Sequence, residues 1–159
     1  MHASVYEWVG SVFKEFELAH RPTLEVGSGN VNGTVRDHFR GEYLGVDIAP
    51  GDGVDLVADA ETLGGVQDHW QVIVSTEMLE HVKHPWRAVR AMAVVAAPGA
   101  HLMLTARGYD QRGVWEPHAF PHDYWRFSDG SMRAMAEDAG LAVLSVEQDP
   151  EGPDRKSVV

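Results

Sequence analysis

The sequence has no cysteine, no long apolar run and few basic residues. The absence of cysteine excludes disulfides, thiolate metal sites and cysteine nucleophiles, and leaves the redox compartment open. No apolar stretch approaches the length that spans a bilayer, and residues 1–4 lack the basic and apolar segments of a secretory signal. We therefore expect a cytoplasmic protein with no membrane partner.

Acidic residues outnumber basic ones, 24 to 13, so the formal net charge is −11 with histidine neutral. A field of that sign opposes binding to nucleic acid, and the basic residues form no run. A small-molecule partner is therefore the expectation, with no nucleic acid. The length of 159 residues suits one domain with its own core, spanning 1–159.

Apolar periodicity predicts strands that alternate with helices. The helix over 4–18 has one apolar stripe, and we favour packing on the sheet over a lid on the site for this segment, 1–20. We expect further helices over 31–39, 85–97 and 128–140, and strands over 24–26, 43–47, 54–57, 70–75, 101–105 and 141–146. Residues 106–127 are expected to be irregular and 147–159 to be a loose tail.

This alternation predicts an α/β fold. It favours a Rossmann-like, doubly wound and mostly parallel sheet with helices on both faces. In such sheets ligands bind at the carboxyl ends of the strands, where the strand order reverses. Each candidate motif follows a predicted strand.

The first of these motifs is the turn after 24–26. Gly27 and Gly29 permit a tight strand-to-helix turn and close approach of a ligand. A dinucleotide site would have a third glycine where Asn32 stands. Glu25 would repel a pyrophosphate and suits a ligand that presents a cation. The alternative is a tight turn without a ligand.

Two more carboxylates follow the second and third strands. Asp47 is placed to accept hydrogen bonds from a ribose diol, or else to cap the turn at 48–50. Asp59 is placed to bind the exocyclic amine of an adenine, or to cap the turn at 61–63, and these two roles are compatible.

Five segments in order resemble motifs of the class I S-adenosylmethionine-dependent methyltransferases, in their small-molecule, type 11-like branch. The matching segments are 24–29 (LEVGSG), 43–48 (YLGVDI), 57–61 (VADAE), 70–82 (WQVIVSTEMLEHV) and 97–105 (APGAHLMLT). The resemblance runs from Leu24 to about Leu144. It implies S-adenosyl-L-methionine as the cofactor, S-adenosyl-L-homocysteine as the product, and methyl transfer to an oxygen or nitrogen of a small molecule.

The resemblance also implies roles for individual residues. Glu25 would lie near the methionine amino group, Asp47 would hold the ribose and Ile48 would pack on the adenine. The other cofactor-binding residues that it implies are Gly27, Ser28, Gly29, Asp59, Ala60, Ser75, Thr76 and Glu77.

Histidines provide the candidate bases for an oxygen or nitrogen acceptor. They are His81, His118 and His122, with Asp123 to orient one of them. His81 also forms a Glu-x-x-Glu-His set with Glu77 and Glu80 that could hold a divalent cation, but packing and capping is the interpretation we favour, so we expect no metal.

The loop after 101–105 is expected to face the acceptor. Trp115, Tyr124 and Trp125 would form walls for the substrate, and Arg126 would pair with an acidic group on it. The alternative for Trp125, Arg126 and Phe127 is a structural plug under the last helix.

The sequence departs from the family pattern in two places. Val31 stands where a further glycine is frequent, and the chain has barely a dozen residues for the family's seventh strand. The sheet is therefore expected to be shortened at this end, either without a seventh strand or with a stub at 156–159. An uncovered edge would favour a homodimer.

Two other functions stay open at this stage. One is a nicotinamide- or nucleotide-binding Rossmann domain, against which Asn32 argues. The other is a non-catalytic methyltransferase-like binding module, against which Glu25, Asp47 and Asp59 argue.

Overall fold

A computed structural model describes residues 3–109, 122–149 and 155–158 of the chain. It contains a seven-stranded sheet in the order β3-β2-β1-β4-β5-β7-β6. The strands are β1 Thr23–Val26, β2 Tyr43–Asp47, β3 Leu56–Val57, β4 Trp70–Ser75, β5 Ala96–Ala106, β6 Ser145–Gln148 and β7 Arg155–Val158. The helices are α1 Ala3–Glu15, α2 Pro85–Val95 and α3 Asp129–Asp138, with 3₁₀ turns η1 Arg36–His38 and η2 Leu79–His81.

Strands β1 to β5 pair in parallel, which confirms the doubly wound α/β fold. The order reverses between β1 and β4, which are neighbours although β2 and β3 separate them in sequence. β4 has the predicted bounds, because its run Val72-Ile73-Val74 is fully buried on both sides. The point at which the strand order reverses is therefore at the carboxyl ends of β1 and β4.

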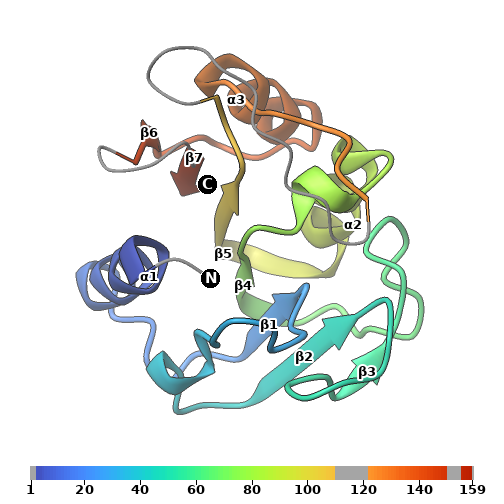
Figure 1. Cartoon of the computed structure of the whole chain (residues 1–159). Helices are drawn as coiled ribbons and strands as arrows, with labels where there is room; N and C mark the ends of the chain where they lie inside the picture. Colours follow the sequence, from blue (N-terminus) through green and yellow to red (C-terminus); the bar gives the residue numbers. More distant parts are fainter. Residues whose placement is uncertain (1–2, 110–121, 150–154, 159) are drawn as a thin grey trace.

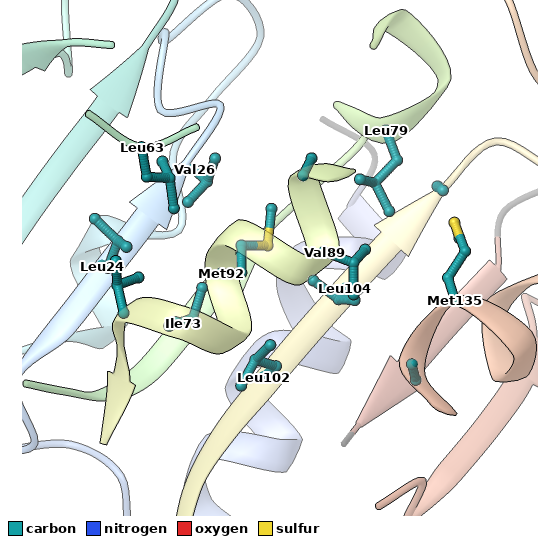
Figure 2. Close-up of a cluster of buried hydrophobic side chains, with 14 of the residues drawn as sticks. Leu24, Val26, Leu63, Ile73, Leu79, Val89, Met92, Leu102, Leu104 and Met135 are labelled. Carbon is teal, nitrogen blue, oxygen red and sulfur yellow. The ribbon is translucent and has the colours of Figure 1, made fainter. Parts of the chain in front are cut away.

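Helices cover both faces of the sheet (Figure 1). On one face, Val9 and Phe13 of α1 pack in a cluster with β4 and β5. On the other face, α2 and α3 close the larger core, where Val89 and Met92 of α2 lie over the strands (Figure 2). None of the helices within the described residues is long and apolar enough to cross a membrane.

The predicted helix over 31–39 is wrong. Only η1, at Arg36–His38, is helical there. The Asn30 side chain accepts a hydrogen bond from the Gly33 amide, and Thr34 accepts one from the Arg36 amide, so side chains bind amides that a helix would otherwise use. Gly33 also has a φ of 116°, outside the helical region.

Pro98 and Gly99 do not end a helix as predicted. α2 ends at Val95, and both residues lie within β5. The pairing of β4 with β5 moves from Trp70–Ala96 to Val72–His101, so the extra residues of β5 bulge out of the ladder there. A proline without an N–H and a glycine at φ 78° suit such a bulge.

The far end of the sheet also differs from the expectation. β6 begins at Ser145 and not at 141, and β7 forms within the segment predicted to be a tail. β7 lies between β5 and β6 and is antiparallel to both. A seventh strand is therefore present, as in the stub alternative, and it covers the edge of β5 on which the homodimer prediction depended.

Ser128 caps α3 as predicted. Its hydroxyl accepts a hydrogen bond from the Ser131 amide, and the Ser131 hydroxyl accepts one from the Ser128 amide. At the other end of the chain, the Ser4 hydroxyl of α1 donates to the buried Asp149 carboxylate after β6.

Candidate functional site

A cleft runs along the carboxyl ends of the strands that meet where the order reverses. It consists of two adjoining cavities, of about 230 and 610 Å³, that share Gly27, Asp47, Met78 and His81 in their walls. Ten of the eleven predicted cofactor residues line one or both. The larger cavity is lined by Glu25, Gly27, Ser28, Gly29, Asp47, Thr76 and Glu77, and the smaller by Gly27, Asp47, Ile48, Asp59 and Ala60.

The exception is Ser75. Its side chain is fully buried at the end of β4 and lines neither cavity. The next residues, Thr76 and Glu77, reach the larger cavity in its place. Ser75 therefore lies behind the wall of the cleft.

The glycine turn at the end of β1 has the close packing that its sequence predicts. Gly27 has a φ of 86°, and a Cβ placed there would lie 2.6 Å from Met78 Cγ. The Gly27 and Ser28 amides both donate to the Val46 carbonyl, which ties the turn to β2. Only glycine meets both requirements at position 27.

Asp47 and Asp59 both have local capping roles. The Asp47 carboxylate accepts from the Gly29 amide at 2.9 Å and from the Ile48 amide at 2.7 Å. Asp59 accepts from the Glu61 amide at 2.8 Å. Both carboxylates nevertheless line the cleft, so their capping is compatible with contact to a ligand.

Glu25 is a strongly perturbed carboxyl of the cleft. Its side chain is 4% exposed and accepts a hydrogen bond from the Tyr43 hydroxyl at 2.5 Å. Burial raises the pKa of Glu25 from 4.5 to about 7, although Tyr43 and Arg36 oppose that rise. Near neutral pH this carboxyl is close to half ionised, so a cation in the cleft would favour its charged form.

Glu77 occupies a strained backbone position at the end of β4. Its φ is 51°, which is uncommon for a residue with a side chain. Thr105 of β5 stabilises it, because its hydroxyl donates to the Glu77 carboxylate at 2.8 Å and both its hydroxyl and carbonyl oxygens accept from the Glu77 amide. The result is a carboxylate fixed at the wall of the larger cavity.

His81 lines both cavities, and its ring is 17% exposed. Its Nδ1 donates to the His122 carbonyl, because a carbonyl oxygen can only accept. In the neutral ring Nε2 is then the acceptor nitrogen. Among the described residues no group of three or more histidine and acidic side chains is arranged to hold a metal ion.

The other predicted catalytic and substrate residues are scattered. His118 and Trp115 lie outside the described residues. The exposed ring of His122 packs near Tyr124, with 5.4 Å between ring centroids, and does not line either cavity. Tyr124 lines the smaller cavity, as Asp59 and Ala60 do.

Arg126 is buried rather than turned toward the cleft. Its side chain is 1% exposed and forms a two-point ion pair with Asp123, with Nη2 to Oδ2 at 2.8 Å. Asp123 therefore pairs with Arg126, where the sequence suggested that it would orient a histidine. This placement is the one expected of the structural plug.

Sequence reasoning missed Met78, Tyr43 and Arg36. Met78 packs under the glycine turn and lines both cavities. Tyr43 and Arg36 act on Glu25 from β2 and η1. A signal for Tyr43 did exist, since in parallel β1 and β2 it stands two pairs away from Glu25 and therefore on the same face.

The cleft suits a cation better than a phosphate. The residues that the structure places around the larger cavity include Glu25, Asp47, Asp52 and Glu77 but no lysine or arginine. A sulfonium and an ammonium fit such a lining, whereas a pyrophosphate would meet carboxylates.

Comparison with known proteins agrees with this chemistry. The profile of a methyltransferase domain family matches residues 12–146. No protein with a curated description matches the chain.

Solved structures with the same fold include S-adenosylmethionine-dependent methyltransferases. One from Clostridium acetobutylicum is 8% identical, with coverage of 99% of this chain and 91% of that one and a TM-score of 0.74. One from Mesorhizobium loti is 17% identical, covers 96% of each chain and has a TM-score of 0.70. A third is the 1,6-didemethyltoxoflavin N1-methyltransferase of Burkholderia thailandensis, solved with 1,6-didemethyltoxoflavin and S-adenosylhomocysteine. It is 10% identical, with coverage of 97% and 76% and a TM-score of 0.73.

The family match extends over most of the chain, and the seven-stranded sheet and the acidic cleft are consistent with it. The chain belongs to the methyltransferase domain family, within the class I S-adenosylmethionine-dependent methyltransferases, and its cofactor is S-adenosylmethionine.

Proposed function

We propose that this protein transfers a methyl group to an oxygen or nitrogen atom of a small molecule. The observation that carries the proposal is the continuous cleft, in which Glu25, Asp47 and Asp59 line two adjoining cavities at the carboxyl ends of the strands. The small-molecule acceptor is supported by the solved neighbour that acts on 1,6-didemethyltoxoflavin.

Most of the predicted cofactor-binding residues lie at the larger cavity, at the smaller cavity or, like Asp47, at both. Glu25 at the larger cavity would bind the amino group of the cofactor, with Gly27, Ser28 and Gly29 against its methionine part. Asp47, shared by both cavities, would hold the ribose. Ile48, Asp59 and Ala60 at the smaller cavity would contact the adenine.

The bound cofactor supplies a methyl group on an electrophilic sulfonium. The protein contributes mainly by holding the acceptor in position and by excluding water. His81 is our first choice of base, because it lines both cavities and its neutral Nε2 can accept a proton from an acceptor hydroxyl or amine. His118 and His122 remain candidates, as do Trp115 and Tyr124 for substrate contacts, whereas the buried ion pair of Arg126 with Asp123 argues against a substrate contact by Arg126.

The net charge of −11 supports a small-molecule acceptor over a nucleic acid. A cytoplasmic location and a homodimer also remain predictions. With β5 covered by β7, the strand that offers an outer edge at this end is β6. Light scattering that returned only monomer would contradict the dimer.

The test has two stages. Isothermal titration with S-adenosylhomocysteine and, separately, with NAD should show binding of the first alone, and binding of NAD alone would indicate a nucleotide-binding Rossmann domain. Radiolabelled S-adenosylmethionine and a panel of small phenols, amines and heterocycles should then yield labelled product. Tight cofactor binding with no transfer to any fraction of a cell extract would favour a non-catalytic module.

A further inference from the structure

Tyr43 connects the cleft to an exposed ion pair on the same side of the sheet. Its hydroxyl donates to Glu25 Oε2, and the Arg36 guanidinium lies over its ring at 4.6 Å from the centroid. Arg36 in turn pairs with Asp55 at 3.1 Å, and the same Asp55 oxygen accepts from the Gly45 amide at 2.7 Å. A chain of contacts therefore runs from Asp55 through Arg36 and Tyr43 to the buried carboxyl.

The strand register explains why Tyr43 is the residue that reaches Glu25. The direct partner of Glu25 on β2 is Gly45, which has no side chain. Tyr43 pairs with Thr23 and shares the face of Glu25, so its hydroxyl occupies the diagonal position beside the carboxylate.

The Tyr43 hydroxyl donates a hydrogen bond to the Glu25 carboxylate. A hydrogen bond of this direction stabilises the charged form of a carboxyl group. Arg36 places a positive charge behind the ring. Both effects lower the pKa of Glu25, and burial, the larger effect, raises it. Without Tyr43 the buried carboxyl would lose this donor, and its neutral form would prevail to higher pH.

We propose that Tyr43, supported by Arg36 and Asp55, is a positioning residue that keeps Glu25 ionised and aimed at the cationic amino group of the cofactor. This inference rests on the proposed cofactor-binding role of Glu25. It makes cofactor affinity sensitive to pH near neutrality, since a protonated Glu25 must release its proton before it can pair with a cation.

Several other charged groups face Glu25 and limit how this dependence is measured. Asp47 and Asp55 raise its pKa, and Arg36 lowers it. Glu77, which follows β4, and His81 of η2 line the same cavity. The effect of Tyr43 on the pH dependence is therefore measured as the difference between the pH profiles of matched variants.

The experiment measures S-adenosylhomocysteine affinity by isothermal titration between pH 5.5 and 8.5 for the wild type, Tyr43→Phe and Tyr6→Phe. Tyr6 is a matched control, because it lies on α1 against His38 and not beside Glu25. We expect Tyr43→Phe to bind about fivefold to tenfold more weakly than wild type at pH 7, with a smaller loss at pH 8.5. Tyr6→Phe should follow the wild-type profile.

A loss of affinity in Tyr43→Phe that is equal at every pH would overturn the inference, because it would indicate a structural role alone. If Tyr43→Phe does not fold, Arg36→Gln carries the same test and should shift the profile in the same direction. Titration of the Glu25 carboxyl by NMR in the protein without ligand separates the two proposals. An upward shift in Tyr43→Phe supports the role of Tyr43 even if S-adenosylhomocysteine fails to bind, and an unchanged titration overturns it.

Discussion

In the half of the cleft formed by β1, β2 and β3, carboxylates are held by amides of nearby turns, as Asp47 is by Ile48 and Asp59 by Glu61. In the half beside β4, the segment 122–127 is held against residues 80–82. His81 donates to the His122 carbonyl, the Tyr124 amide to the Glu80 carbonyl, and the Trp125 indole to the Val82 carbonyl. The first half depends on amides of neighbouring residues and on bonds between residues eighteen apart, such as the Gly29 amide to Asp47 and the Tyr43 hydroxyl to Glu25. The second half depends on contacts between segments about forty residues apart in sequence.

The largest expected effect lies in the second half. Arg126→Gln should lower the free energy of unfolding by about 3–5 kcal/mol, because it removes the guanidinium that pairs at two points with the buried Asp123 carboxylate. Arg90→Gln is the matched control, since Arg90 pairs with Asp138 on the surface and should change stability by less than about 1 kcal/mol. Urea unfolding measures both. If Arg126→Gln kept its stability and lost only turnover of acidic acceptors, Arg126 would be a substrate residue after all.

The next effect lies in the glycine turn of the first half. Gly27→Ala should cost about 2–4 kcal/mol of stability, since alanine is strained at a φ of 86° and its Cβ would meet Met78. It should also weaken S-adenosylhomocysteine binding. Gly64→Ala, where a Cβ would lie no closer than 3.9 Å to its nearest neighbour, Thr62 Oγ1, provides the control in the same assays. Equal stability for the two variants would contradict the close packing assigned to the turn.

Glu25→Gln should have opposite effects on stability and binding. Glu25 binds its proton more tightly in the folded protein than in the unfolded chain, so its contribution to stability falls as pH rises from about 4.5 to 7. Glu25→Gln removes that loss and should be more stable than wild type by about 1–3 kcal/mol at pH 8, with the difference shrinking toward pH 4.5.

The same substitution should weaken S-adenosylhomocysteine binding about tenfold to a hundredfold at pH 8, the size of a lost hydrogen bond to a charged group. Thermal unfolding at a series of pH values and calorimetric titration report the two effects. A stability difference that did not change with pH would show that Glu25 titrates normally.

The smallest expected effect concerns the hydrogen bonds between segment 122–127 and residues 80–82. Trp125→Phe removes the hydrogen bond to the Val82 carbonyl and should cost about 1 kcal/mol. Hydrogen exchange should show less protection of the Tyr124 amide, which bonds to Glu80 next to this contact. Trp86→Phe retains the hydrogen bond from the Trp125 indole to the Val82 carbonyl and is expected to leave the protection of the Tyr124 amide close to that of wild type.

This contrast explains what the sequence could predict. The alternation of strands with helices, the bounds of β4 and the Ser128 cap follow from local patterns. So does the set of residues at the strand ends, because turns place Gly27, Asp47 and Asp59. The helix expected over 31–39 failed since Asn30 and Thr34 bind amides through their side chains, which apolar periodicity does not detect.

The second half could not be predicted in the same way. Nothing in the residues around His81 specifies that its ring will meet a carbonyl at His122. An arginine such as Arg126 is a residue type that binds acidic substrates. The fold shows instead that Asp123 pairs with it in a buried position. The left-handed Glu77 likewise depends on Thr105, which belongs to the next strand.

The position of β7 between β5 and β6 has a consequence for how the domain is assembled. β6 pairs only with β7 in the described sheet, so residues 145–148 have no strand to join until residues 155–158 are in place. During synthesis the sheet would remain open at β5 until that later segment leaves the ribosome. A chain cut between these strands would therefore lose two of them and expose the long edge of β5 to pairing with other chains.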